Sequence, residues 1–73
     1  MLDFPSRLRN LRIKKSLTQK AMAEYLQITE TGYQYYEHGK CETNFATLVK
    51  LANYFKVSVD YLLGLTDNPE RNL

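Results

Sequence analysis

The chain is 73 residues long, with 44% apolar and 25% charged residues, one cysteine and one histidine. This composition fits one small soluble domain, without the run of about 18 apolar residues that spans a membrane and without a cleavable leader pattern. A single Cys41 excludes an internal disulfide, and one Cys with one His falls short of a structural zinc site. We therefore expect a cytoplasmic protein with no metal, cofactor, small-molecule ligand or membrane partner.

The net charge of +2 is unevenly distributed along the sequence. Residues 1–40 carry seven basic and four acidic side chains, whereas residues 41–73 carry three basic and four acidic ones. A basic N-terminal half favours a polyanionic partner such as nucleic acid. Ordinary solvated lysines and arginines on helix surfaces would give the same count, so charge supports DNA binding without establishing it.

The spacing of apolar residues predicts an all-α fold of five helices, because they recur every three or four positions and no alternating strand pattern occurs. The first helix is expected to start near Pro5, which suits a first helical turn, and to run to about Lys15. Its core-facing stripe consists of Phe4, Leu8 and Leu11.

Two short helices are predicted next, from Gln19 to Leu26 with Thr18 as N-cap, and from an N-cap at Thr29 to about His38. Gly39 ends the second of them, since glycine adopts the left-handed conformation at little cost. This spacing, over residues 18–38, is typical of a helix-turn-helix, in which the first helix braces the second against DNA. The residues expected to hold the pair together are Met22, Ala23, Leu26, Tyr33 and Tyr36.

A fourth helix is expected from Asn44 or Phe45 to Phe55 and should supply most of the core. The apolar residues at helical spacing in it are Phe45, Leu48, Val49, Leu51, Ala52 and Phe55. A short fifth helix opens at Ser58 and closes at Gly64. Residues 67–73 form a polar tail that is expected to fray.

On a helical wheel, the segment from Thr29 to His38 separates into two faces. One face is inward and holds Thr29, Tyr33 and Tyr36, whereas the outward face holds Glu30, Thr31, Gln34 and Tyr35. Glutamine suits adenine, a carboxylate accepts from cytosine, threonine touches a thymine methyl, and tyrosine contacts a methyl, sugar or phosphate. We expect the four outward residues to read DNA bases, because a merely solvated face would not need an exposed tyrosine.

Residues 4–66 resemble the Cro/CI-type helix-turn-helix family of phage repressors and related bacterial regulators, also called the xenobiotic-response-element family. The resemblance is carried by Leu8, Leu11 and Arg12, by Leu17-Thr18-Gln19, Ala23 and Ile28-Thr29, by Tyr36-Glu37-x-Gly39, and by the run from Val57 to Gly64. It implies a lambda-repressor-like domain over residues 1–66. That domain would bind double-stranded operator DNA as a transcriptional regulator, with a repressor as the expected type.

The resemblance also implies roles around the reading face. The residues expected to contact phosphates are Thr18 and Gln19, with His38, Lys40, Thr43 and Asn44 in and before the following loop. Gly32 is also expected to lie near the phosphates, but as a departure from the family: relatives usually carry Ser or Thr there, and glycine allows closer backbone approach to DNA. Arg12 is expected to form a structural ion pair with Glu37 that fixes the angle of the reading helix. Gln27 stands where relatives carry glycine, in a left-handed conformation that costs about 1 kcal/mol.

A domain of this size touches few base pairs, so we expect a homodimer on a near-palindromic operator. The resemblance places the dimer surface at the fifth helix and after it, with Tyr61, Leu62 and Leu65 as candidates. Leu62 and Leu63 would serve equally well in the core.

Two other classes of function were weighed against DNA binding. A protein-interaction module, such as an antitoxin or antirepressor-like partner, would use the same fold and its tyrosine-rich face, and a regulatory protein partner fits either interpretation. An enzyme is not expected, because Cys41 and His38 lack a third orienting group and a substrate pocket.

Overall fold

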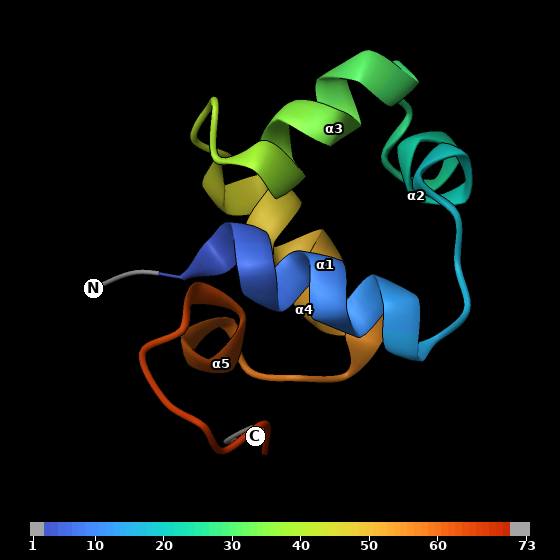
Figure 1. The fold of residues 1–73 in the computed structure, drawn as a ribbon. Coiled ribbons are helices and arrows are strands. Elements are labelled where there is room, and N and C mark those ends of the chain that lie inside the picture. Colours follow the sequence, from blue (N-terminus) through green and yellow to red (C-terminus); the bar gives the residue numbers. More distant parts are fainter. Residues whose placement is uncertain (1–2, 71–73) are drawn as a thin grey trace.

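Five α-helices make up the part of the chain that the computed structural model describes, residues 3–70, and no strand occurs within that range (Figure 1). They are α1 (Phe4–Lys14), α2 (Gln19–Leu26), α3 (Glu30–His38), α4 (Phe45–Phe55) and α5 (Val59–Leu63). The predicted all-α fold is confirmed, and α1 is shifted by one residue from its expected bounds. None of these helices is both long and apolar enough to cross a membrane.

Side-chain caps explain where four of the helices begin. The caps are Thr18 on Ala21 N, Thr29 on Gly32 N, Asn44 on Thr47 N and Ser58 on Tyr61 N, at 2.8–3.0 Å. Each oxygen accepts from an N–H that the helix itself leaves unpaired. The ends of α3 and α5 are set by Gly39 and Gly64, both in the left-handed conformation.

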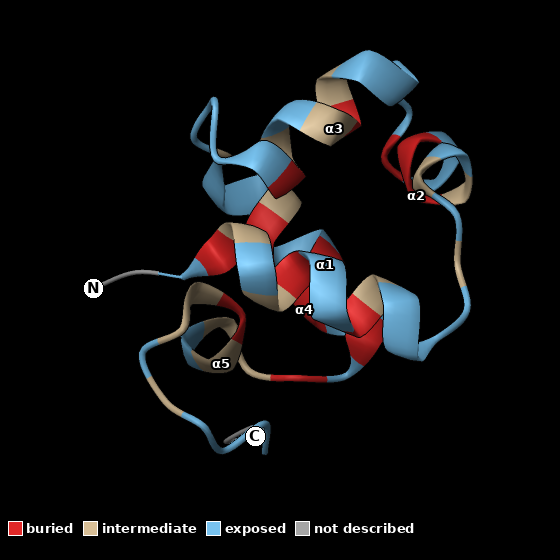
Figure 2. Cartoon of the chain, viewed as in Figure 1, coloured by how far each residue is buried: buried red, intermediate tan, exposed pale blue. Residues whose placement is uncertain are grey.

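The core lies where the helices meet: α3 packs against α1 and α2, and α5 packs against α1 and α4. Figure 2 shows buried positions on the sides of the helices that face one another. The largest fully buried side chains are Leu8, Met22, Tyr33, Leu51 and Leu62. They come from all five helices, so α3 is held by the same core as the rest of the domain.

Two residues expected in the core of α4 lie outside it. Phe45 is 87% exposed and Val49 is 51% exposed, so the prediction is wrong for both. Val49 lies about 100° around the helix from the buried Leu48, and Phe45 stands in the first turn, beyond the packed part of the helix. The buried stripe of α4 consists of Leu48, Leu51, Ala52 and Phe55.

The described part of the C-terminal tail is bonded to the folded chain. The N–H of Ser58 donates to the carbonyl of Pro69 at 3.1 Å, and Arg7 Nη2 lies 3.3 Å from Asp67 Oδ1. Asp67 and Pro69 therefore contact the folded chain, although residues 67–70 are all exposed. Residues 71–73 of the predicted tail and residues 1–2 of the predicted domain lie outside the described range.

Candidate nucleic-acid interface

The turn between α2 and α3 is closed by a residue in the left-handed conformation. Gln27 has φ 59° and ψ 43°, as expected from its place in the turn. The N–H groups of Gln27 and Ile28 donate back to carbonyls of α2, and Thr29 immediately caps α3. The turn therefore spans only residues 27–29, which fixes α3 closely against α2.

Glu37, near the end of α3, is the buried centre of a hydrogen-bond network. Arg12 of α1 donates from Nε to Glu37 Oε2 at 2.6 Å and from Nη2 to Oε1 at 3.1 Å. Gln19 Nε2 of α2 donates to Oε1 at 3.2 Å, and the hydroxyl of the buried Tyr33 donates to Oε2. The expected Arg12–Glu37 pair is present, with two donors that the sequence did not indicate.

Burial alone would raise the pKa of Glu37, but hydrogen bonds from Arg12, Tyr33 and Gln19 outweigh it and lower that pKa. The same contacts raise the pKa of the two donors Tyr33 and Arg12. Burial and the hydrogen bond to Glu37 raise the pKa of Tyr33, and the hydrogen bond to Glu37 raises that of Arg12. Glu37 is thus ionised and Tyr33 protonated at neutral pH, which suits an acceptor surrounded by donors.

The network continues to the outward face of α3 through Gln34. Gln34 Nε2 donates to Gln19 Oε1 at 3.2 Å, and Gln19 in turn donates to Glu37. We call Arg12, Gln19, Tyr33, Gln34 and Glu37 together the Glu37 network. It joins α1, α2 and α3, so it sets the position of a candidate base-reading side chain from the interior of the domain.

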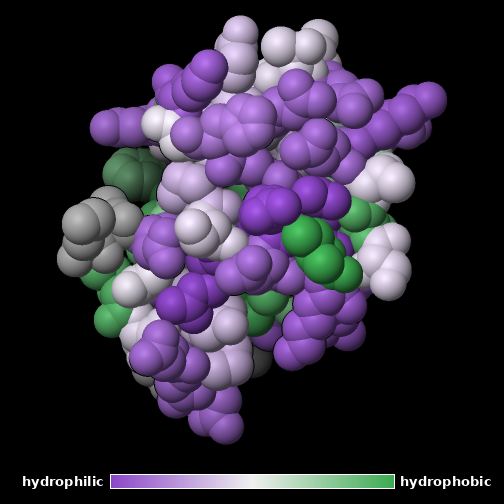
Figure 3. Space-filling view, in the orientation of Figure 1, coloured by the Kyte–Doolittle hydropathy of each residue, from purple (hydrophilic) through white to green (hydrophobic). Residues whose placement is uncertain are grey.

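The outward face of α3 is polar and open. Glu30 and Thr31 are exposed, Tyr35 is 46% exposed, and Gln34 is half-buried. Figure 3 shows hydrophilic side chains over most of the visible surface around α3 and α2. The four predicted base-reading residues therefore lie on one helix, with three of them freely accessible and the fourth bonded to Gln19.

The predicted phosphate contacts fall into two groups. Thr18, Asn44, His38 and Lys40 are exposed, although the side-chain oxygens of Thr18 and Asn44 already cap helices. Gln19 and Gly32 are less accessible, because their polar groups are already bonded within the protein. Gln19 is half-buried in the Glu37 network, and the N–H of Gly32 is donated to Thr29.

Thr43 is a correction to the predicted set. Its Oγ1 is buried and has no hydrogen-bond partner, so it does not face a phosphate. Thr43 also lines a hollow of about 400 Å³ together with Phe4, Phe45 and Leu48. Cys41, in the same loop, is exposed.

A groove of about 930 Å³ adds residues of α1 that sequence reasoning missed. Its lining combines Ser6, Arg9, Asn10 and Arg12 of α1 with Leu17, Thr18, Gln19 and Lys20, and with Glu30, Glu37 and His38 of α3. Arg9 and Lys20 place two cations beside the start of α2. The sequence feature that could have identified Arg9 is its position on the polar face of α1, directly after the buried Leu8.

The predicted dimer residues differ in exposure. Leu62 is fully buried in the core, so it cannot lie between two copies, and its assignment to the dimer surface is wrong. Tyr61 is half-buried beneath the guanidinium of Arg7, which lies 4.0 Å from its ring centre. Leu65, which follows α5, is 59% exposed.

The tyrosine-rich face on which the protein-interaction alternative depends is not at the surface. Tyr33 is fully buried, and Tyr36 is half-buried with its ring edge against Phe4 of α1. Only Tyr35 of the three tyrosines in α3 is exposed. This removes the main feature that favoured a protein partner over DNA.

Comparison with known proteins gives consistent matches. Residues 6–68 match the family model described as a helix-turn-helix domain. Over 60 residues the chain is 47% identical to the SPbeta prophage-derived uncharacterized HTH-type transcriptional regulator YonR of Bacillus subtilis, covering 82% of this chain and 56% of YonR. The chain spans little more than half the length of the curated relatives it matches.

Two solved structures have a similar fold. A transcriptional regulator from Listeria innocua superposes with a TM-score of 0.86 and 26% identity, covering 100% of this chain and 64% of that chain. The P22 c2 repressor, solved in complex with a synthetic operator, gives a TM-score of 0.75 and 27% identity, covering 82% of this chain and 91% of that chain.

Proposed function

Because the chain belongs to the helix-turn-helix domain family and has the expected lambda-repressor-like fold, we propose that it is a sequence-specific transcriptional regulator. It binds double-stranded DNA in the bacterial cytoplasm and inserts α3 into the major groove. The P22 c2 relative is a repressor held on an operator, which favours repression as the mode of action here too. The DNA-binding unit in this proposal is residues 1–66.

The observation that carries the proposal is the combination of a rigidly held helix and an open polar face. The Glu37 network fixes α3 from within, while Glu30, Thr31 and Tyr35 remain exposed on its outer side. Side chains of these types meet the base edges of the major groove. A helix that only covered the core would need neither the buried ion pair nor this accessible face.

Flanking residues supply the backbone contacts in this proposal. Lys40 after α3 and Lys20 with Arg9 beside the start of α2 are cations on either side of the reading face. The start of α2 also offers unpaired N–H groups and its positive dipole end to a phosphate. Such contacts position α3 without selecting a sequence.

A single domain covers one half-site, so we propose a symmetric homodimer with two copies of α3 about 34 Å apart. The exposed apolar side chains available for this contact include Leu65 after α5 and Phe45 at the start of α4. Tyr61 of α5, the other predicted dimer residue, is half-buried. An isologous contact of this kind would match a near-palindromic operator.

The test is selection of bound sequences from a random pool of double-stranded DNA at a fixed salt concentration. We expect an enriched palindrome whose affinity falls steeply with added salt, because binding releases counterions from the phosphates. A Lys40→Ala variant should weaken binding to all sequences about equally and reduce the salt slope by about one.

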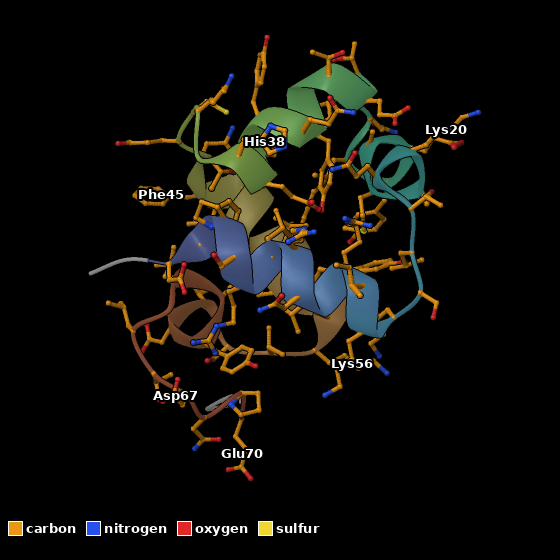
Figure 4. All side chains as sticks on the ribbon, in the orientation of Figure 1. Lys20, His38, Phe45, Lys56, Asp67 and Glu70 are labelled. Carbon is orange, nitrogen blue, oxygen red and sulfur yellow. The ribbon has the colours of Figure 1, made fainter. Side chains whose placement is uncertain are left out.

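Absence of any enriched sequence would contradict the proposal. Binding to a protein partner that changed little with salt would then favour the interaction-module alternative. The matched control is Lys56→Ala, which removes a lysine at the opposite end of the domain from α3 (Figure 4) and should leave both affinity and salt slope unchanged.

A further inference from the structure

The direction of every hydrogen bond in the Glu37 network follows from the buried carboxylate of Glu37. The side chain of Glu37 is 1% exposed and its carboxylate meets the guanidinium of Arg12, so it carries no proton and only accepts. The lowered pKa of Glu37 agrees with this state. Gln19 must therefore turn its Nε2 toward Glu37, which leaves Gln19 Oε1 as the atom that faces Gln34.

The same logic fixes the amide of Gln34. Since Gln19 Oε1 only accepts, Gln34 must donate to it from Nε2, and the distance between these atoms is 3.2 Å. An amide nitrogen has two hydrogens, of which one is now used. Within residues 3–70, this is the one side-chain hydrogen bond that Gln34 makes. Its free edge thus presents one acceptor, Oε1, beside one remaining N–H donor.

An acceptor and a donor side by side complement adenine, which shows an N6–H donor and the N7 acceptor in the major groove. Guanine shows two acceptors there, N7 and O6, and would need two donors from the same side chain. Gln34 could supply two only if both of its N–H groups were free. The bond to Gln19 removes one of them.

We propose that Gln34 selects adenine at one position of each half-site and that Gln19 enforces this choice by occupying the second N–H of Gln34. Gln19 acts as a positioning residue and Gln34 as the base-reading one. The inference rests on the proposed function, because it concerns which base the same face of α3 prefers.

The experiment starts from the enriched palindrome and measures affinity for duplexes that carry each of the four bases at each half-site position. The wild type should prefer adenine at one position by roughly 5- to 150-fold over the other bases, the range of one bidentate contact. Gln34→Ala should lose the preference at that position only. Gln19→Met, which is similar in length but cannot accept, should admit guanine there while still disfavouring pyrimidines.

The measured base preference distinguishes a positioning role of Gln19 from a role in phosphate binding or in stability. Loss of a phosphate contact or of stability would weaken binding to all sequences alike. Glu24→Gln, an exposed α2 residue outside the network, is the matched control and should keep the wild-type preference.

Three outcomes would overturn the proposal, and they differ in what else they reject. If Gln34→Ala keeps every base preference, Gln34 does not read a base. If Gln19→Met discriminates adenine from guanine as well as the wild type does, Gln19 does not enforce the choice. If the wild type enriches no sequence at all, the proposed function fails together with this inference.

Discussion

Arg12 is the residue on which the position of α3 depends most directly. It makes three hydrogen bonds, two to the carboxylate of Glu37 and one from Nη1 to the carbonyl of Leu17 at 2.9 Å. Replacing Arg12 with Met leaves Glu37 buried without its cation, which should lower the free energy of unfolding by about 3 kcal/mol. Urea unfolding at neutral pH measures this change.

The exposed ion pair between Arg7 and Asp67 provides the comparison for Arg12. Asp67 is fully exposed, so Asp67→Asn should leave the unfolding midpoint nearly unchanged. If Arg12→Met and Asp67→Asn lowered the free energy of unfolding equally, burial would not increase the contribution of the Arg12–Glu37 pair to stability.

Glu37 links stability to pH in a direction set by its lowered pKa. A carboxyl whose pKa is lower in the folded than in the unfolded chain stabilises the fold above its unfolded pKa. That contribution is lost as the pH falls below the ordinary value of 4.5 and through the folded pKa. The free energy of unfolding of the wild type should therefore decline in acid more steeply than that of Glu37→Gln. Urea titrations at a series of pH values test this, and parallel pH profiles would contradict it.

At the scale of the element, the turn before α3 carries a local strain that a substitution should relieve. Gln27 has a left-handed backbone, which a residue with a Cβ adopts at a cost of about 1 kcal/mol. Gln27→Gly should raise the free energy of unfolding by about 0.5–1 kcal/mol, less than the full strain because glycine makes the unfolded chain more flexible. Thermal unfolding followed by circular dichroism measures the gain.

Gln27→Ala separates relief of strain from loss of the glutamine side chain. Alanine keeps the Cβ, so this variant should gain no stability. A gain of equal size in both variants would show that the left-handed backbone is not the cause.

The bounds of the helices were predictable because their signals are local. Thr18, Thr29 and Asn44 cap helices through bonds that span three residues, and Gly39 ends α3 through its own backbone. Burial was less predictable, because it depends on which neighbour covers a face. Apolar spacing could not show that no helix covers Phe45 or Val49.

The candidate site was likewise predictable only in part. The exposed residues of α3 follow from its helical period, whereas the bond between Gln19 and Gln34 joins side chains 15 positions apart on different helices. Tyr33 was expected to face inward and hold the helix pair together, but that expectation did not include the bond from its hydroxyl to the buried Glu37. Contacts of this kind arise from the packing of three helices and have no signature in one of them.

Across the whole molecule, two acidic side chains of the C-terminal tail, Asp67 and Glu70, lie far from α3. Lys20, on α2, lies in the same half as α3, whereas Asp67 and Glu70 lie at the far end together with the basic Lys56 (Figure 4). A uniform distribution of charge would give little preference for one face toward a polyanion. In the proposed complex with DNA, Asp67 and Glu70 would lie away from the phosphates, which limits their repulsion of the duplex at a net charge of only +2.

The proposed dimer can be tested by placing a charge at Leu65. Leu65→Glu should place a charge in the contact, shift the protein toward monomers in sedimentation equilibrium, and lower operator affinity roughly tenfold or more. Ile13→Glu makes the same change at another exposed apolar residue, on α1, and should leave the dimer intact. Wild-type sedimentation by Leu65→Glu would exclude this surface.

The exposed Cys41 gives the molecule a built-in attachment point. It is the only thiol in the chain and lies in the loop that follows α3. A nitroxide coupled there needs no engineered cysteine, and in a symmetric pair it yields one interspin distance. That single distance, recorded by pulsed electron resonance with and without operator, would follow the approach or separation of the two loops as the duplex binds.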